Sequence, residues 1–141
     1  MTVKCFLEQY RKADRKARKL FREYMKEQSL IDALKSPLGQ SGEVHGSGIS
    51  KSVEQRAIRL ADKSNEYREA SLEALEIRQE IVDAIKGING REYDALYEYY
   101  VDYYDEKNKR AKTWEDVANI VGVDPRSIFR IRLRAFGKMS L

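Results

Sequence analysis

Five cationic side chains and no carboxylate occupy residues 125–141. Guanidinium groups donate paired hydrogen bonds to phosphate oxygens and to guanine edges, so this segment predicts contact with a polyanion. A nearby stretch, residues 90–106, carries six acidic side chains and one basic one. The charges therefore separate into one basic and one acidic surface, although the whole chain is only mildly basic, with a net charge of +4. The five cations are Arg126, Arg130, Arg132, Arg134 and Lys138.

Residues with catalytic or metal-binding chemistry are scarce. The 141-residue chain has one cysteine, Cys5, and one histidine, His45, whereas disulfide scaffolds, zinc sites and Cys–His nucleophilic pairs need more than one such residue. The glycines before Lys51 resemble a phosphate loop only faintly, because no glycine directly precedes the lysine. We predict that the protein is not an enzyme and has no catalytic residue, no cofactor and no metal site.

The basic segment follows a stretch with strong helix-start signals. Thr113 and Asp116 have the spacing of a capping box, in which each side chain accepts a hydrogen bond from the other's backbone N–H. Asp124 before Pro125 is typical of a second helix start, because proline suits the first helical position. Residues 113–133 therefore predict a helix, a tight turn and a second helix.

Four residues have the spacing that makes this pair of helices specific. Ala118 is small enough for a crossing helix, and Gly122 lies where the chain must turn sharply. Ile128 and Ile131 then return to the core on the second helix. This pattern is typical of the helix-turn-helix, whose second helix enters the DNA major groove. The competing interpretation is an ordinary helical hairpin with a solvated basic face.

The candidate DNA contacts are the outward positions of the second helix and the start of the first. We expect Arg126 and Arg130 to read bases, and Arg134 and Lys138 to contact phosphates. Free N–H groups at Thr113 could hold another phosphate. Phe129 either touches a thymine methyl group or packs against the helix that we predict over residues 91–104. The full predicted set is Thr113, Trp114, Arg126, Ser127, Phe129, Arg130, Arg134 and Lys138.

Residues 93–139 resemble region 4 of sigma-70 factors. The resemblance rests on YDALYEYYVDYY, TWEDVANIVGV and DPRSIFRIRLRAFGKM. In layout, the whole chain is similar to small phage late-transcription regulators of the RinA and ArpU type. The resemblance implies a DNA-binding regulator of phage or prophage late genes that recognises a promoter element and touches host RNA polymerase. Phe129 and Arg130 replace the acidic and polar readers usual in sigma factors, which leaves the target sequence open.

The rest of the chain predicts an all-α protein, with a long N-terminal antiparallel helical hairpin before the helix-turn-helix lobe. We expect the first helix over residues 1–35, a Gly/Ser-rich flexible linker over 36–52, the second helix over 53–89, and the DNA-binding domain over 90–141. Apolar residues in the two long helices recur at alternating steps of three and four, as in coiled coils.

Several finer features of these elements follow from the pattern. Folding the hairpin near residue 44 would pair Tyr24 with Ser64 and Phe6 with residues 81–82. Ser52 and Gln55 predict a capping box at the start of the second hairpin helix. An apolar stripe predicts a further helix over residues 91–104, followed by a polar connection.

A two-helix hairpin buries little surface, so we expect a homodimer formed through the two long helices. No apolar run approaches the ~18 residues of a membrane span, which predicts no membrane partner and a location in the bacterial host cytoplasm, associated with the nucleoid. The expected partner is double-stranded DNA, with host RNA polymerase as a second candidate. Two other functions stay open: a phage terminase small subunit, and an RNA-polymerase-binding or anti-sigma protein without DNA contact.

Overall fold

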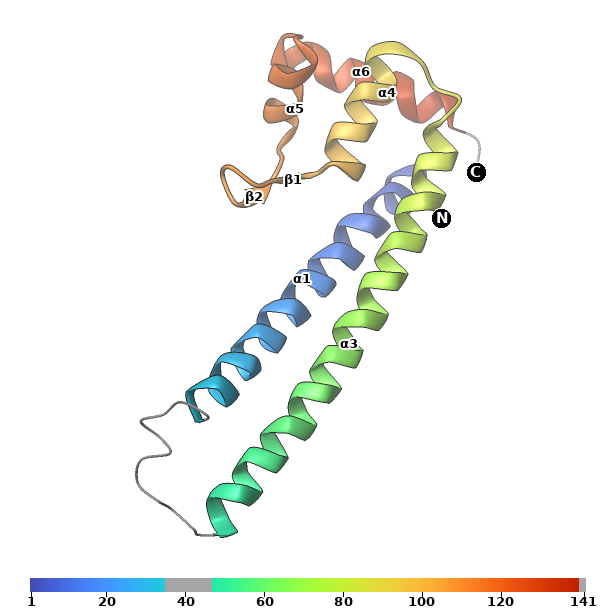
Figure 1. Cartoon of the computed structure of the whole chain (residues 1–141). Coiled ribbons are helices and arrows are strands. Elements are labelled where there is room, and N and C mark those ends of the chain that lie inside the picture. The colour runs from blue at the N-terminus through green and yellow to red at the C-terminus, as the bar shows by residue number, and fades with distance from the viewer. Residues whose placement is uncertain (35–46, 140–141) are drawn as a thin grey trace. The chain divides into compact units, whose positions relative to one another are not determined.

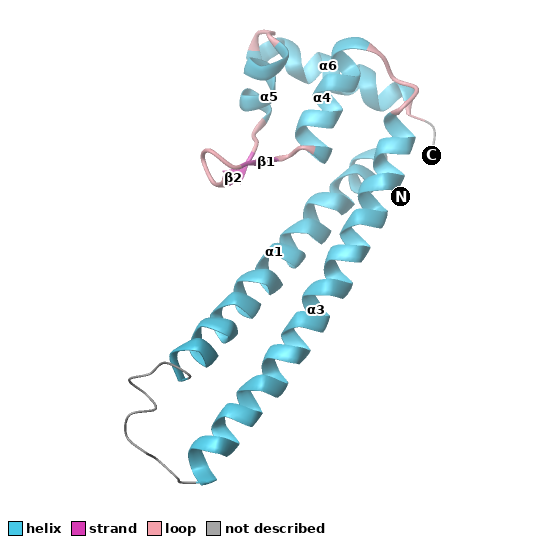
Figure 2. Cartoon of the chain, viewed as in Figure 1, coloured by secondary structure: helices cyan, strands magenta, loops and turns pink. Residues whose placement is uncertain are grey.

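The structure, a computed structural model, describes residues 1–34 and 47–139, with side chains from residue 52 in the second part. It confirms the all-α class, with a helical hairpin before a helix-turn-helix lobe (Figures 1 and 2). The elements are α1 (Val3–Leu34), α3 (Ser47–Ile85), α4 (Gly90–Leu96), the π-helix η1 (Tyr97–Val101), β1 (Tyr104–Asp105), β2 (Arg110–Ala111), α5 (Trp114–Val121) and α6 (Pro125–Lys138).

The two long helices pack antiparallel in the predicted register. The Lys63 ammonium lies 3.0 Å from the Glu23 carboxylate, and the rings of Phe21 and Tyr67 have centroids 5.1 Å apart. Tyr24 and Ser64, which the sequence pattern pairs, line one shallow hollow. Phe6 likewise packs against the core cluster that contains Ile81.

The predicted start of the second long helix is wrong. Helix α3 begins at Ser47, so the last six residues of the predicted linker are helical, and residues 36–46 lie outside the described part. Ser52 and Gln55 therefore lie inside a helix and do not form its cap. No proline stands between Ser47 and Val53, and extending an existing helix by a turn costs little compared with starting one.

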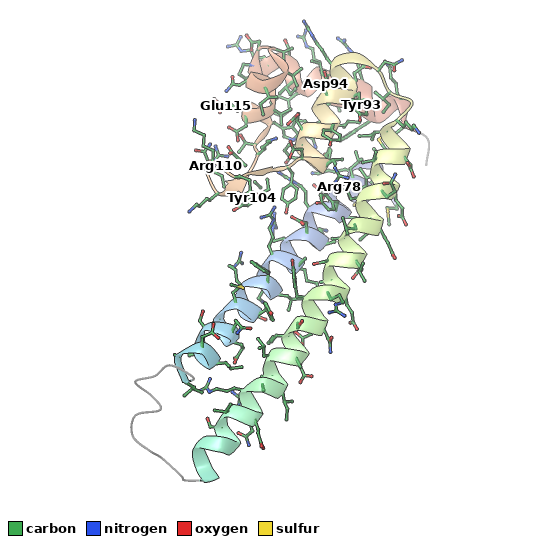
Figure 3. The ribbon with its side chains drawn as sticks, in the orientation of Figure 1. Arg78, Tyr93, Asp94, Tyr104, Arg110 and Glu115 are labelled. Atoms are coloured by element: carbon green, nitrogen blue, oxygen red, sulfur yellow. The ribbon has the colours of Figure 1, made fainter. Side chains whose placement is uncertain are left out.

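The chain divides into two compact units. One consists of Met1–Ala13 together with Ala74–Leu141, and the other of Asp14–Glu73. The first unit has two core clusters, one of which joins Leu7 of α1, Ile81 and Ile85 of α3, and Ala135 of α6. Within this unit Arg78 also donates a 3.3 Å hydrogen bond to the Tyr97 hydroxyl (Figure 3). The helix-turn-helix lobe therefore shares its core with the first residues of the chain.

The helix predicted over residues 91–104 ends early. After Leu96 the chain forms one π-helical turn, closed by a 2.8 Å bond from the Asp102 N–H to the Tyr97 carbonyl. A π turn accommodates one residue more than an α turn, so the inward positions shift along the sequence. Tyr103 is buried, and Tyr104 pairs instead with Ala111 in a two-residue antiparallel ladder. This ladder begins at the last residue of the predicted helix and continues into the stretch that the sequence predicts as a polar connection.

Candidate nucleic-acid interface

The capping box at the start of α5 is confirmed. Thr113 Oγ1 accepts a 3.2 Å hydrogen bond from the Asp116 N–H, and Asp116 Oδ2 accepts one of 2.8 Å from the Thr113 N–H. Arg110 from β2 adds an ion pair at 2.7 Å (Figure 3). The Arg110 guanidinium and the Thr113 N–H hold the pKa of the Asp116 carboxyl well below its usual range. These bonds fix the position at which α5 begins.

The turn between α5 and α6 also has the predicted geometry. Gly122 adopts φ 82° and ψ 37°, in the left-handed region that favours glycine. The N–H groups of Gly122 and Val123 both donate to the Ala118 carbonyl at 2.9 Å. Asp124 then caps α6 by accepting a 2.8 Å hydrogen bond from the Arg126 N–H. The chain therefore changes direction within the three residues that separate α5 from α6.

The crossing of α5 and α6 forms the second core cluster of this unit. Ala118 is fully buried, and Ile128 and Ile131 of α6 are buried in the same cluster. Val117 of α5 and Ala95 of α4 complete it. The small side chain of Ala118 permits the close approach of the helices, as its place in the sequence pattern predicts.

The outer side of α6 is basic with an apolar component. Arg126, Arg130 and Arg134 are exposed, and none of their guanidinium groups has a hydrogen-bond or ion-pair partner among the described residues. Phe129 is 52% exposed and does not pack against the core. Leu133, one turn further along, is 68% exposed. The sequence analysis did not assign Leu133 to the site, although its spacing from Phe129 would have placed it there.

The remaining predicted contacts are less available. Ser127 is half-buried, and the Lys138 ammonium forms an ion pair with Glu92. The hydroxyl of Thr113 is taken up by its own capping box. Five of the eight predicted residues therefore lie exposed on α6, but only the three arginines among them present free cationic groups.

Trp114 lies in an aromatic cluster. Its ring stacks on Tyr99 with a centroid distance of 3.8 Å and an interplanar angle of 8°. The Arg132 guanidinium lies 5.0 Å from the Trp114 centroid, and the Arg11 guanidinium 4.0 Å from the Tyr99 centroid. Arg11 also donates a 2.7 Å hydrogen bond to the Lys112 carbonyl. The indole ring therefore has a packing role, and Arg132 is the one arginine of α6 that is used internally.

The short turn, its two capped helices and the buried crossing define a helix-turn-helix unit. No known family model, curated protein or solved structure matches the chain. Among the described helices, none is long and apolar enough to cross a lipid bilayer. The described residues also contain no group of three His, Cys, Asp or Glu side chains that could hold a metal ion.

Proposed function

We propose that this protein is a sequence-specific DNA-binding transcription regulator that inserts α6 into the major groove. The observation that carries the proposal is the set of three exposed, unpartnered arginines on the outer side of the second helix of a helix-turn-helix. An arginine that serves only the fold is normally paired or stacked, as Arg132 is in this unit. Arg126, Arg130 and Arg134 have no such partner, so their guanidinium groups are available to bases and phosphates.

The position of each arginine along α6 suggests its role. Arg126 lies in the first turn, where side chains of a recognition helix reach base edges, and Arg130 lies one turn later. Arg134 and Lys138 lie further along, where the helix would leave the groove and approach the phosphates. Asp116 already occupies the N–H of Thr113, so a phosphate contact at the start of α5 has less support than the contacts of α6.

Titrations on cognate and scrambled duplexes at two salt concentrations test this proposal, after genome-wide footprinting has located the cognate site. Arg126→Ala or Arg130→Ala is expected to cost about 1–3 kcal/mol on the cognate duplex and to relax sequence preference. Arg134→Ala should weaken binding to both duplexes alike. Lys138→Ala should do so less, because its ion pair with Glu92 already offsets part of its charge. Equal losses on both duplexes for Arg126→Ala and Arg134→Ala would contradict the assigned roles.

We also propose, from the region 4-like stretch, that the regulator belongs with phage late-gene activators of the RinA and ArpU type and touches host RNA polymerase. Footprints near promoters and co-purification with polymerase support this proposal. Footprints at a packaging start site, with rings of eight or more subunits, would identify a terminase small subunit instead. Polymerase binding without salt-sensitive DNA binding would identify an anti-sigma or polymerase-binding protein.

The unit Asp14–Glu73 supports a homodimer. Among the described residues of this unit, the buried apolar ones are Ala17, Ile31 and Ala70, of which two are alanines. Larger apolar side chains of the same unit are exposed, and burying them against a second copy would contribute about 25 cal/mol per Å². These side chains are Phe21, Met25, Leu30, Leu34, Ile58 and Leu72.

Light scattering tests the dimer directly. The expected mass is about twice the 16.4 kDa of one chain. Met25→Glu combined with Leu30→Glu should shift the mass towards the monomer, whereas Arg15→Glu combined with Lys16→Glu changes charge on the same helix without removing apolar area. A wild-type monomer at tens of micromolar would reject the dimer.

A further inference from the structure

A polar hollow of about 630 Å³ lies beside α6, within the unit that contains the helix-turn-helix. One wall is a flank of α6 that carries Ser127, Arg130 and Arg134. The turn before α6 forms a second wall. The third wall is the junction between α3 and α4, which contributes Asn89 and Arg91. We call this feature the basic hollow.

Among the described residues, the carboxylates that line the basic hollow have partners, whereas its guanidinium groups do not. The guanidinium groups of Arg91, Arg130 and Arg134 have no hydrogen-bond or ion-pair partner among the described residues. The two carboxylates of the lining are both engaged, since Glu92 binds Lys138 and Asp124 accepts the Arg126 N–H. The hollow therefore has three free cationic groups and an excess of hydrogen-bond donors.

The chemistry of the lining indicates the class of ligand. Sites for small organic ligands are lined mainly by apolar and aromatic side chains, whereas guanidinium, amide and hydroxyl groups dominate in the basic hollow. One arginine guanidinium can donate two parallel hydrogen bonds to two oxygens of a phosphate group. A ligand with several phosphates at its surface therefore fits the hollow better than an apolar molecule.

The basic hollow is continuous with the proposed DNA surface, because Arg130 and Arg134 belong to both. We propose that it holds the sugar–phosphate backbone of one DNA strand beside the groove that α6 enters, and that Arg91 is a positioning residue for that strand. Arg91 lies outside the helix-turn-helix, on the helix that precedes it. A phosphate held on this side would fix how deeply α6 inserts and in which direction it points. This inference rests on the proposed function.

The test measures the salt dependence of DNA binding by wild type, Arg91→Ala and a matched control, Arg59→Ala. Arg59 is an exposed arginine on α3, in the other compact unit, and its guanidinium has no partner among the described residues. Loss of one phosphate contact should lower the slope of log K against log salt by about 0.9 for Arg91→Ala. Cognate and scrambled duplexes should weaken alike, because a phosphate contact carries no base information. Arg59→Ala should keep the wild-type slope.

The outcomes separate this inference from the proposed function. If wild type binds DNA and Arg130→Ala weakens it, but Arg91→Ala keeps the wild-type slope, the positioning role of Arg91 is wrong and the proposed function stands. If wild type shows no salt-sensitive DNA binding, both fail. Titration with inorganic pyrophosphate and with a nucleoside triphosphate distinguishes free phosphates from DNA. Micromolar binding of either that depends on Arg91, together with an unchanged DNA slope, would overturn the DNA assignment.

Discussion

Replacing glycine by alanine is expected to have opposite effects on stability at two positions, one just before α6 and one within it. Gly122 stands at φ 82° in the turn, whereas Gly137 lies within the last turn of α6 and has no positive φ. A Cβ added at either position would meet no atom within 4 Å. The added methyl group therefore causes no steric clash at either site, and the two sites differ only in their backbone conformation.

The expected changes in the free energy of unfolding follow from the backbone conformation at each glycine. An L-residue in the left-handed region costs about 1–2 kcal/mol, and the lower entropy of the unfolded alanine chain offsets about 0.4–1 kcal/mol of it. Gly122→Ala should therefore lower the free energy of unfolding by about 0.8 kcal/mol at the middle of these ranges, and by about 1.6 kcal/mol at most. Gly137→Ala should raise it by up to about 1 kcal/mol, because alanine favours the helix. Gly122→Asn should lie nearer to wild type than Gly122→Ala, since asparagine tolerates the left-handed region.

Urea unfolding followed by far-ultraviolet circular dichroism measures these differences. For a slope of about 1–3 kcal/mol per molar urea, a change of 1 kcal/mol moves the midpoint by about 0.3–1 M. A neutral or stabilising Gly122→Ala would refute the left-handed turn. Destabilisation of similar size at both glycines would show that the added methyl group, and not the backbone conformation, sets the cost.

Other predictions concern the start of α5. Trp114→Ala should lower the free energy of unfolding, measured in urea, by about 2–4 kcal/mol, because stacking on Tyr99 and packing with Arg132 are both lost. Trp114→Phe should keep a large share of both the stability and the DNA affinity. If the Trp114→Phe protein is stable but binds DNA much more weakly than wild type, the predicted contact between Trp114 and DNA is supported. Asp116→Asn should cost about 1 kcal/mol near pH 7. The folded pKa of Asp116 lies below the unfolded value of about 3.9, so its contribution is present above about pH 4 and is lost as the pH falls further. The gap between the urea midpoints of the two proteins should therefore narrow progressively as the pH falls below about 4, and a constant gap would contradict this.

The helix-turn-helix could be predicted in detail because its signals are local. Capping residues act on N–H groups two or three positions away, and the spacing of Ala118, Gly122 and Ile128 reflects contacts within one short segment. The register of the hairpin could be predicted only to about one turn, because the long linker between the two seams does not fix it. Phe129 was left open between two roles, and only its exposed fraction decides against the packed one.

The features missed depend on contacts between distant parts of the chain. Trp114 was assigned to DNA because its packing partners, Tyr99 and Arg132, come from other helices. The π turn at Tyr97–Val101 has no propensity signal of its own, since it follows from fitting tyrosines into the core. Arg91 was not selected because the basic hollow forms only when three separate segments meet.

Leu7 and Ala135 belong to the same core cluster, which has a consequence for how the chain folds during synthesis. The first helix leaves the ribosome early, but its partner on α6 is made 128 residues later, which takes about 6–26 s at ~5–20 residues per second. During that delay α3 can cover part of the apolar cluster around Leu7, but the part that α6 covers stays exposed. Closing such a long loop is also slow compared with forming local helix pairs. We expect the hairpin to form first, and the helix-turn-helix to reach its final stability only after the last helix has been released.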